Sequence, residues 1–185
     1  MFEGLDRSRT FTTAPKKEPV GAHLRYFLKS SNDQILACLL WTSPAWKMAA
    51  RDLWIGWNSQ QRRRNLQYIV NNGRFLILPW VHVKGLASTI LSRSARQLLQ
   101  DWRQHYGYKP LLLETLVDAT RFSGTSYRAA NWTYLGKTIG GNRTDRLHRA
   151  RPNPARLIFI FPLHRHVQQR LRIIDPPTPL SIGDE

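Results

Sequence analysis

The stretch from Arg74 to Lys137 reads RFLILPWVHVKGLASTILSRSARQLLQDWRQHYGYKPLLLETLVDATRFSGTSYRAANWTYLGK. Its apolar run over 74–83 predicts a strand, and residues 86–106 predict a long helix that a Gly-Tyr-Lys-Pro sequence ends. The apolar residues 111–117 predict a second, buried strand. A strand, a helix and a strand in this order indicate a βαβ unit.

The turn between this first strand and the helix contains Gly85 and Ala87. Backbone N–H groups and the positive end of the helix dipole point into such a turn, so it suits an anion, and pyrophosphate is the obvious candidate. A βαβ unit without any ligand is the alternative. The candidate ligand-binding residues are Val83, Lys84, Gly85, Leu86, Ala87 and Ser88.

Before this stretch, the sequence predicts a hairpin and two helices. Apolar runs over 23–29 and 34–41 flank a Ser-Ser-Asn-Asp turn, which indicates a β-hairpin. A short helix over 45–54 follows. Asn58 is a candidate N-cap for a second helix, which the Asn-Asn-Gly sequence at 71–73 should end.

After the second strand of the βαβ unit, the sequence predicts a short helix over 127–131 and a strand over 132–138. A last strand is expected over 155–163, followed by a basic helical turn. The segment 139–154 is rich in Gly, Arg, Asn and Pro, which favours a mobile loop whose arginines grip phosphates.

The size and composition of the chain predict one domain. It has 185 residues, 42% of them hydrophobic, and we expect the domain over 23–170 between flexible segments 1–22 and 171–185. The single cysteine, Cys38, excludes an internal disulfide and a Cys-rich zinc site, and no metal is expected. No segment approaches the roughly 18–20 apolar residues that span a bilayer, and none resembles a signal peptide, so we expect a cytoplasmic protein without a membrane partner.

Charge is the feature in which the composition departs most from the average. The 28 Lys and Arg against 12 Asp and Glu leave a net charge of +16, which favours nucleic acid as a partner. A solvated basic surface is the alternative. We expect contacts to phosphates that are non-specific in sequence and sensitive to salt. The arginines expected to make them are Arg62, Arg63, Arg64, Arg143, Arg146, Arg149 and Arg151.

Two further features bear on nucleic-acid binding. The three arginines at 62–64 are expected near the start of their helix, where the helix dipole opposes them and a polyanion would relieve them. Several tryptophans could stack on bases, although packing in the core is the alternative. These are Trp41, Trp46, Trp54, Trp57 and Trp80.

The sequence His82-Val83-Lys84-Gly85-Leu86-Ala87 resembles the turn of GNAT acyltransferases, which has the form Arg/Gln-x-x-Gly-x-Gly/Ala and holds the pyrophosphate of acyl-coenzyme A. Here His82 stands where that family has a long polar residue. The segment from Tyr127 to Gly136 also resembles this fold, with Asn-Trp in place of its Gly-Phe pair. The resemblance implies an α+β fold, with a mixed, mostly antiparallel central sheet flanked by helices, and acyl-coenzyme A as cofactor.

Longer phrases resemble a second family over nearly the whole chain. They read TSPAWKMAARDLWIGW, QRRRNLQYIVNNGRFLILPWV, LLLETLVD and GTSYRAANWTYLGKT. All are similar to the DruA family of Druantia anti-phage systems, whose members also occur beside transposase genes. That family has a longer N-terminal helical region, and a Gly-Arg-Gly-Arg run where this chain has Gly-Gly-Asn-Arg at 140–143, so we expect a shortened member. The resemblance implies other defence-system or transposon proteins as partners.

Two side chains are candidates for acyl-transfer chemistry. The GNAT resemblance implies that Tyr127 protonates the departing thiolate, while packing of its ring is the alternative. Glu114 lies inside an apolar strand, where a bare charge is costly, and a raised pKa would suit a general base for an amine or hydroxyl. The alternative for Glu114 is a structural ion pair with Arg51 or Arg74.

Two functions therefore stay open. The first is a nucleic-acid-associated protein of an anti-phage or mobile-element system, built on a GNAT-like scaffold. The second is an acyltransferase that uses acyl-coenzyme A. A fold alone does not choose between them, because one scaffold hosts many chemistries.

Overall fold

The computed structural model describes residues 21–144 and 150–173, without the side chains of 141–153. The predicted flexible segments 1–22 and 171–185 therefore lie almost entirely outside the described residues. Along the chain the elements are β1 (His23–Lys29), β2 (Ile35–Thr42), α1 (Ala49–Ile55), α2 (Ser59–Asn65), η1 (Leu66–Tyr68), β3 (Ile69–Ile77), α3 (Leu86–Tyr106), β4 (Leu112–Asp118), α4 (Thr125–Ala129), β5 (Thr133–Lys137), β6 (Gly141–Thr144), β7 (Ala150–Asn153), β8 (Arg156–Pro162) and α5 (Val167–Arg172).

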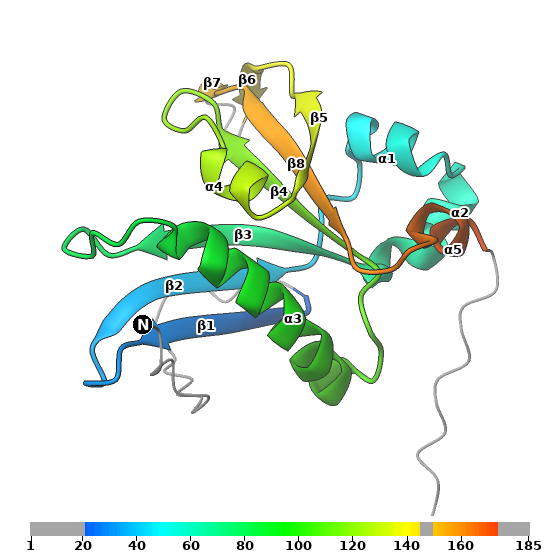
Figure 1. Ribbon diagram of the computed structural model, residues 1–185. Coiled ribbons are helices and arrows are strands. Elements are labelled where there is room, and N and C mark those ends of the chain that lie inside the picture. Colours follow the sequence, from blue (N-terminus) through cyan, green and yellow to red (C-terminus); the bar gives the residue numbers. More distant parts are fainter. Residues whose placement is uncertain (1–20, 145–149, 174–185) are drawn as a thin grey trace, which may run out of the picture.

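The central sheet has the strand order β1-β2-β3-β4-β8-β5 (Figure 1). Within it, β3 and β4 pair in parallel, and the other neighbours pair antiparallel. The expected α+β fold with a mixed, mostly antiparallel sheet is confirmed. The parallel pair is joined by α3, as the βαβ prediction requires.

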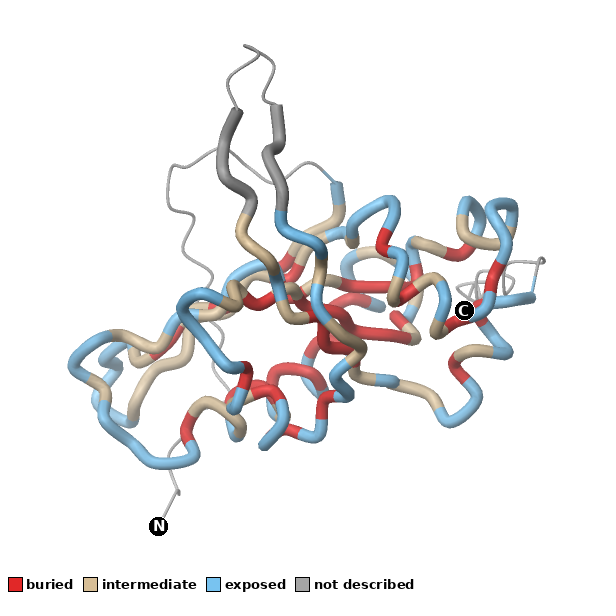
Figure 2. The backbone as a smooth tube through the Cα atoms, turned by 90° about the horizontal axis from the view of Figure 1, so that it is seen from above, coloured by how far each residue is buried: buried red, intermediate tan, exposed pale blue. Residues whose placement is uncertain are grey.

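Helices cover both faces of this sheet. Because strand side chains alternate, neighbouring residues fall into different buried clusters. Val70, Leu113 and Phe159 pack with α3 and α4, whereas Ile69, Leu112 and Ile160 pack with α1 and α5. Figure 2 shows the buried residues concentrated along these central strands and the inner sides of the helices.

The long helix α3 has the predicted bounds. Its buried residues Ile90, Leu91, Leu98 and Trp102 recur at helical spacing, so one stripe faces the sheet. Gly107 follows the last turn in a left-handed conformation, and its N–H donates to the Arg103 carbonyl. Among the described residues, no helix is long and apolar enough to cross a membrane.

The predicted boundary between the second helix and the strand that follows it is wrong. Residues 71–73 do not end a helix but lie inside β3, which starts at Ile69 and ends before most of the predicted strand 74–83. The side-chain amide of Asn72 donates to the carbonyls of Leu40 and Arg74, and the β2–β3 register shifts at Gly73. An Asn-Asn-Gly sequence thus forms a β-bulge here, because the neighbouring strand supplies hydrogen-bond partners that a local signal does not reveal.

Two smaller predictions also change. The first helix begins at Ala49 rather than residue 45. The described parts of the predicted loop 139–154 contain the antiparallel pair β6–β7, in which Arg143 lies opposite Arg151. Main-chain pairing does not require apolar side chains, so a polar sequence did not exclude a hairpin.

Candidate functional site

The strands β3 and β4 pair only at the beginning of their length. Their register covers Ile69 with Leu112, Val70 with Leu113 and Asn71 with Glu114. Beyond these three pairs the strands diverge, and β3 leads into the turn before α3 (Figure 1). The chain therefore opens its parallel pair on the side where the anion-binding turn was predicted.

The turn itself lies at the surface. Gly85 has φ +74° at the N-cap of α3, and a Cβ there would meet no atom within 4 Å. No side chain caps this helix end, while the hydroxyls of Ser88 and Thr89 each donate to the Gly85 carbonyl at 3.0 Å. The amide of Leu86 donates to the Val83 carbonyl at 3.3 Å, so an anion would have to use the amides that follow it, and the ligand of residues 83–88 stays a prediction.

Tyr127 bridges the diverging strands from α4. Its hydroxyl donates to Oδ1 of Asn72 on β3 at 2.7 Å, and its ring packs against Trp132 and Phe159. Burial raises the pKa of Tyr127 to about 12, against the opposing effect of the Thr115 hydroxyl. The phenol is therefore neutral near pH 7, and in this structure it takes the packing role that was the alternative to an acid.

Glu114 lies on the opposite face of the sheet from Tyr127. Its Oε2 accepts from Nη1 of Arg51 at 2.9 Å, with both side chains fully buried, and its Oε1 accepts from the amide of Ala45 at 3.3 Å. Burial raises the pKa of Glu114, while Arg51 and the Ala45 amide oppose this shift. Of the two alternatives, the structure shows the ion pair, and it selects Arg51 over Arg74.

A second carboxylate, Asp52, completes this charged network. It accepts from Arg51 at 2.8 and 3.0 Å, from the indole of Trp57 at 3.0 Å and from Arg62 at 3.4 Å. Two carboxylates thus face the two guanidinium groups of Arg51 and Arg62. Arg62, one of the predicted phosphate contacts, is engaged inside the protein.

The position of the arginines along α2 differs from the prediction. Asn58 caps the helix as expected, in a capping box with Gln61. However, α2 ends at Asn65, so the arginines at 62–64 lie in its last turn, where the dipole favours cations. The prediction that the helix dipole opposes these arginines is wrong, and no polyanion is needed to offset it.

Tertiary structure places α5 beside α2. Gln61 donates to the carbonyl of Arg172 at 2.6 Å, and Asn65 donates to the carbonyls of Leu171, at 3.1 Å, and Ile173. These bonds satisfy carbonyls at the end of α5 that have no partner within the helix. They also bring together basic residues from two distant parts of the sequence.

We call the exposed arginines of these helices and of the turn before α5 the α2–α5 basic surface. Neither helix contains a carboxylate, and Val167 and Leu171 bury the inner side of α5. The basic helical turn predicted after the last strand is α5, and its arginines were not among the predicted phosphate contacts, although the run HRHVQQRLR has the pattern of a basic amphipathic helix. The surface consists of Arg63, Arg64, Arg165, Arg170 and Arg172.

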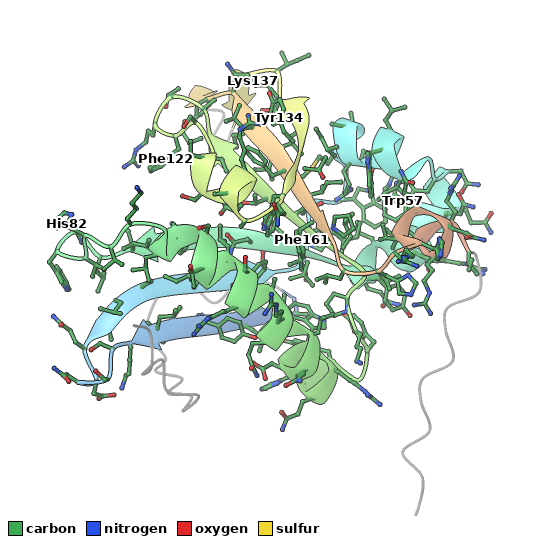
Figure 3. All side chains as sticks on the ribbon, viewed as in Figure 1. Trp57, His82, Phe122, Tyr134, Lys137 and Phe161 are labelled. Atoms are coloured by element: carbon green, nitrogen blue, oxygen red, sulfur yellow. The ribbon has the colours of Figure 1, made fainter. Side chains whose placement is uncertain are left out.

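The predicted anion-binding turn and this basic surface are separate. Figure 3 shows His82 on the turn and Trp57, beside α2 and α5, at opposite sides of the molecule. Of the remaining predicted phosphate contacts, Arg143 and Arg151 lie on β6 and β7. Arg146 and Arg149 fall outside the described residues.

Comparison with known proteins identifies a family and a fold. The family model described as Druantia protein DruA matches residues 8–150, more than half of the chain. No curated protein sequence matches the chain.

Solved structures of acetyltransferases match the fold. A single-residue mutant of spermidine N-acetyltransferase from Vibrio cholerae has a TM-score of 0.51 and 8% identity, covering 82% of this chain and 69% of that one. The dodecameric form of the enzyme from the same organism has a TM-score of 0.50 and 8% identity, covering 77% of this chain and 66% of that one. The chain spans slightly less than two thirds of several such chains. At this identity the likeness shows the GNAT-like fold alone.

Proposed function

The chain belongs to the DruA family, and from this premise we propose that it is a nucleic-acid-associated protein of an anti-phage defence or mobile-element system, built on a GNAT-like scaffold. The α2–α5 basic surface is the observation that carries the proposal. Its arginines would contact phosphates and would carry no sequence information.

The charge balance of this surface supports binding of a polyanion. Asp52, the carboxylate that contacts α2, is already shared between Arg51 and Arg62. Among the salt bridges of the described residues, none involves Arg63, Arg170 or Arg172. Their positive charge therefore faces solvent, where the phosphate backbone of a nucleic acid would neutralise it.

Retention of DNA on a gel at increasing salt tests this proposal. We expect the wild-type chain to retain DNA at low salt with a steep loss as salt rises, and a variant with Arg63, Arg64, Arg170 and Arg172 changed to Glu to lose several-fold in affinity. The matched control changes four basic residues elsewhere, namely Lys84, Arg93, Arg96 and Arg103, to Glu.

Because both variants alter the net charge equally, only a site-specific effect separates them. Equal losses in the two variants would contradict the assignment to the α2–α5 basic surface. No retention by the wild-type chain at low salt would contradict nucleic-acid association itself.

A second candidate function, acyl transfer from acyl-coenzyme A to an amine or hydroxyl, is favoured by the divergence of β3 and β4 beside the turn at Gly85. The turn suits a pyrophosphate, since no side chain caps this helix end and a ligand can approach Gly85 closely. Acyl-coenzyme A would supply the activated acyl group. Tyr127 could donate a proton only by releasing Asn72, and Glu114 could accept one only by disturbing its ion pair with Arg51.

Calorimetry with acetyl-coenzyme A tests this second candidate. If it is correct, Gly85→Glu abolishes binding by placing a carboxylate in the turn. Gly107→Glu is the matched control, because Gly107 also has positive φ and open space but lies at the other end of α3. Absence of binding by the wild-type chain, or equal loss in both variants, would reject the candidate.

A further inference from the structure

The structure sorts the tryptophans that were candidates for base stacking. Trp41 and Trp57 are buried in the two core clusters, and Trp54 is half-buried against the second. Trp46 and Trp80 are 52% and 61% exposed. Only these last two of the five candidates present enough ring surface to receive a base.

Trp46 contacts α2, one of the two helices that carry the α2–α5 basic surface. The guanidinium carbon of Arg62 on α2 is 5.7 Å from the centroid of the Trp46 ring, a cation–π contact. Arg62 is itself held by Asp52 at 3.4 Å. The indole is therefore positioned beside the helix that carries Arg63 and Arg64.

The backbone before Trp46 is also held in place. The amide of Ala45 donates to Glu114, and its carbonyl accepts from Arg51 at 2.9 Å. The buried ion pair thus anchors the residue that precedes the exposed ring. An aromatic side chain that is half exposed, yet fixed at its backbone and beside its ring, is preorganised for stacking, because binding then orders fewer groups.

We propose that Trp46 and the α2–α5 basic surface together bind single-stranded nucleic acid, with the arginines on its phosphates and an unpaired base stacked on Trp46. The inference rests on the proposed nucleic-acid association and adds the strandedness of the partner. Phosphate contacts alone fit a duplex or a single strand. A stacking platform selects unpaired bases, because paired bases in a duplex are already stacked on their neighbours.

This arrangement also predicts that the surface does not discriminate between base sequences or between DNA and RNA. Every base has a π face, so stacking on one tryptophan is tolerant of sequence. Nothing in the contact requires or excludes a 2′-hydroxyl, so single-stranded DNA and RNA of one sequence should bind with affinities within a fewfold of each other.

Fluorescence anisotropy with labelled oligonucleotides tests the inference. The probes are a mixed-sequence single-stranded DNA, the RNA of the same sequence and the DNA duplex, each titrated with the full chain at several salt concentrations. We expect both single strands to bind more tightly than the duplex. We expect Trp46→Ala to weaken single-strand binding roughly tenfold, the range of one base stack, without changing the salt slope.

Trp80→Ala is the matched control, since it removes another exposed indole, located in the turn before α3. It should leave affinity within about twofold of the wild type, and Trp46→Phe should recover most of the loss, because a phenyl ring also stacks. Circular dichroism of each variant checks that the fold is retained.

Four outcomes distinguish the stacking inference from the proposed nucleic-acid association. Equal or tighter binding of the duplex, or equal losses for Trp46→Ala and Trp80→Ala, would overturn the stacking inference while leaving nucleic-acid association intact. A salt slope reduced by Trp46→Ala would also contradict it, because a stacked base releases no counterions. Failure of every oligonucleotide to bind at low salt would defeat the inference and the proposed function together.

Discussion

The two faces of β4 are both buried, yet they contain different chemistry. Toward α3 and α4, Thr115 donates to the Asn72 carbonyl at 3.0 Å, and Tyr127 donates to the Asn72 side chain. Toward α1, one residue earlier on the strand, Glu114 is paired with Arg51. One face is held by neutral hydrogen bonds, and the other by an ion pair.

Because of this difference, the two faces should respond differently when a substitution removes one partner of an interaction. A neutral group that loses its partner costs the desolvation of one polar atom. A buried charge that loses its partner costs several times more, because the protein interior cannot replace the lost attraction and hydration. The charged face should therefore tolerate only paired substitutions, and the neutral face should tolerate single ones better.

The largest expected effect is that of Arg51→Met. It leaves Glu114 buried without its partner, and we expect the free energy of unfolding to fall by about 3–5 kcal/mol. Denaturant unfolding measures the change, and Arg93→Met on the exposed side of α3 is the control. Adding Glu114→Leu should restore most of the loss, since the pair is then replaced by apolar groups. If Arg51→Met lowers the free energy of unfolding no more than Arg93→Met does, the proposed difference between the two faces of β4 is wrong.

On the neutral face, the largest expected effect comes from packing. Gly124 has φ +76°, and a Cβ there would overlap the ring of Phe159. We expect Gly124→Ala to cost roughly 2–4 kcal/mol, from overpacking and left-handed strain together. Gly85→Ala has nearly the same φ and open space, so it should show the strain alone, about 1–2 kcal/mol. Similar costs at the two glycines would mean that α4 does not pack tightly on β8.

A smaller effect is expected from Tyr127→Phe. It keeps the ring contacts but leaves Oδ1 of Asn72 without its donor, which should cost about 1–3 kcal/mol at neutral pH. Burial raises the folded-state pKa of Tyr127 from 10.0 to about 12, so its contribution is complete below pH 10 and is lost as pH rises toward 12. Chemical unfolding of both proteins across this range should show the difference between them shrinking. A constant difference would indicate that the hydroxyl is not buried.

The smallest effect is expected where β4 reaches solvent. Asp118 accepts from the amide and hydroxyl of Thr120 at 2.9 and 2.7 Å, and these bonds lower the pKa of Asp118. Thr120→Ala should raise that pKa toward its ordinary value in an NMR titration. The stability that Asp118 contributes is present above its unfolded pKa and is lost as pH falls through its folded pKa. No change in pKa would show that the turn is not closed by this hydroxyl.

Much of the fold was accessible from sequence because its signals are local. The bounds of α3 follow from its own apolar spacing and from Gly107, and the β1–β2 hairpin follows from two apolar runs around a polar turn. The N-cap at Asn58 was likewise predicted from residue type. Such signals act within a few residues, so no distant partner was needed to interpret them.

The candidate site was less accessible, because its partners lie far apart in sequence. Two arginines, Arg51 and Arg74, were candidate partners of Glu114 in the sequence. Only the packing of α1 against the sheet selected Arg51, which is 63 positions away. The Asn-Asn-Gly bulge needed a neighbouring strand, and the basic surface needed α5 to pack against α2. The periodicity of the sequence shows neither that β2 lies beside the bulge nor that α5 packs against α2.

The amino-acid order alone established the βαβ unit, the long central helix, the excess of positive charge and the resemblance to DruA, since each depends on composition or on short-range pattern. Which charges are neutralised inside and which face solvent depended on the folded chain. It placed Asp52 and Glu114 against Arg51 and Arg62, and it left Arg63, Arg64, Arg170 and Arg172 exposed. Burial and pairing are properties of three-dimensional neighbourhoods, so they emerge only when distant segments come into contact.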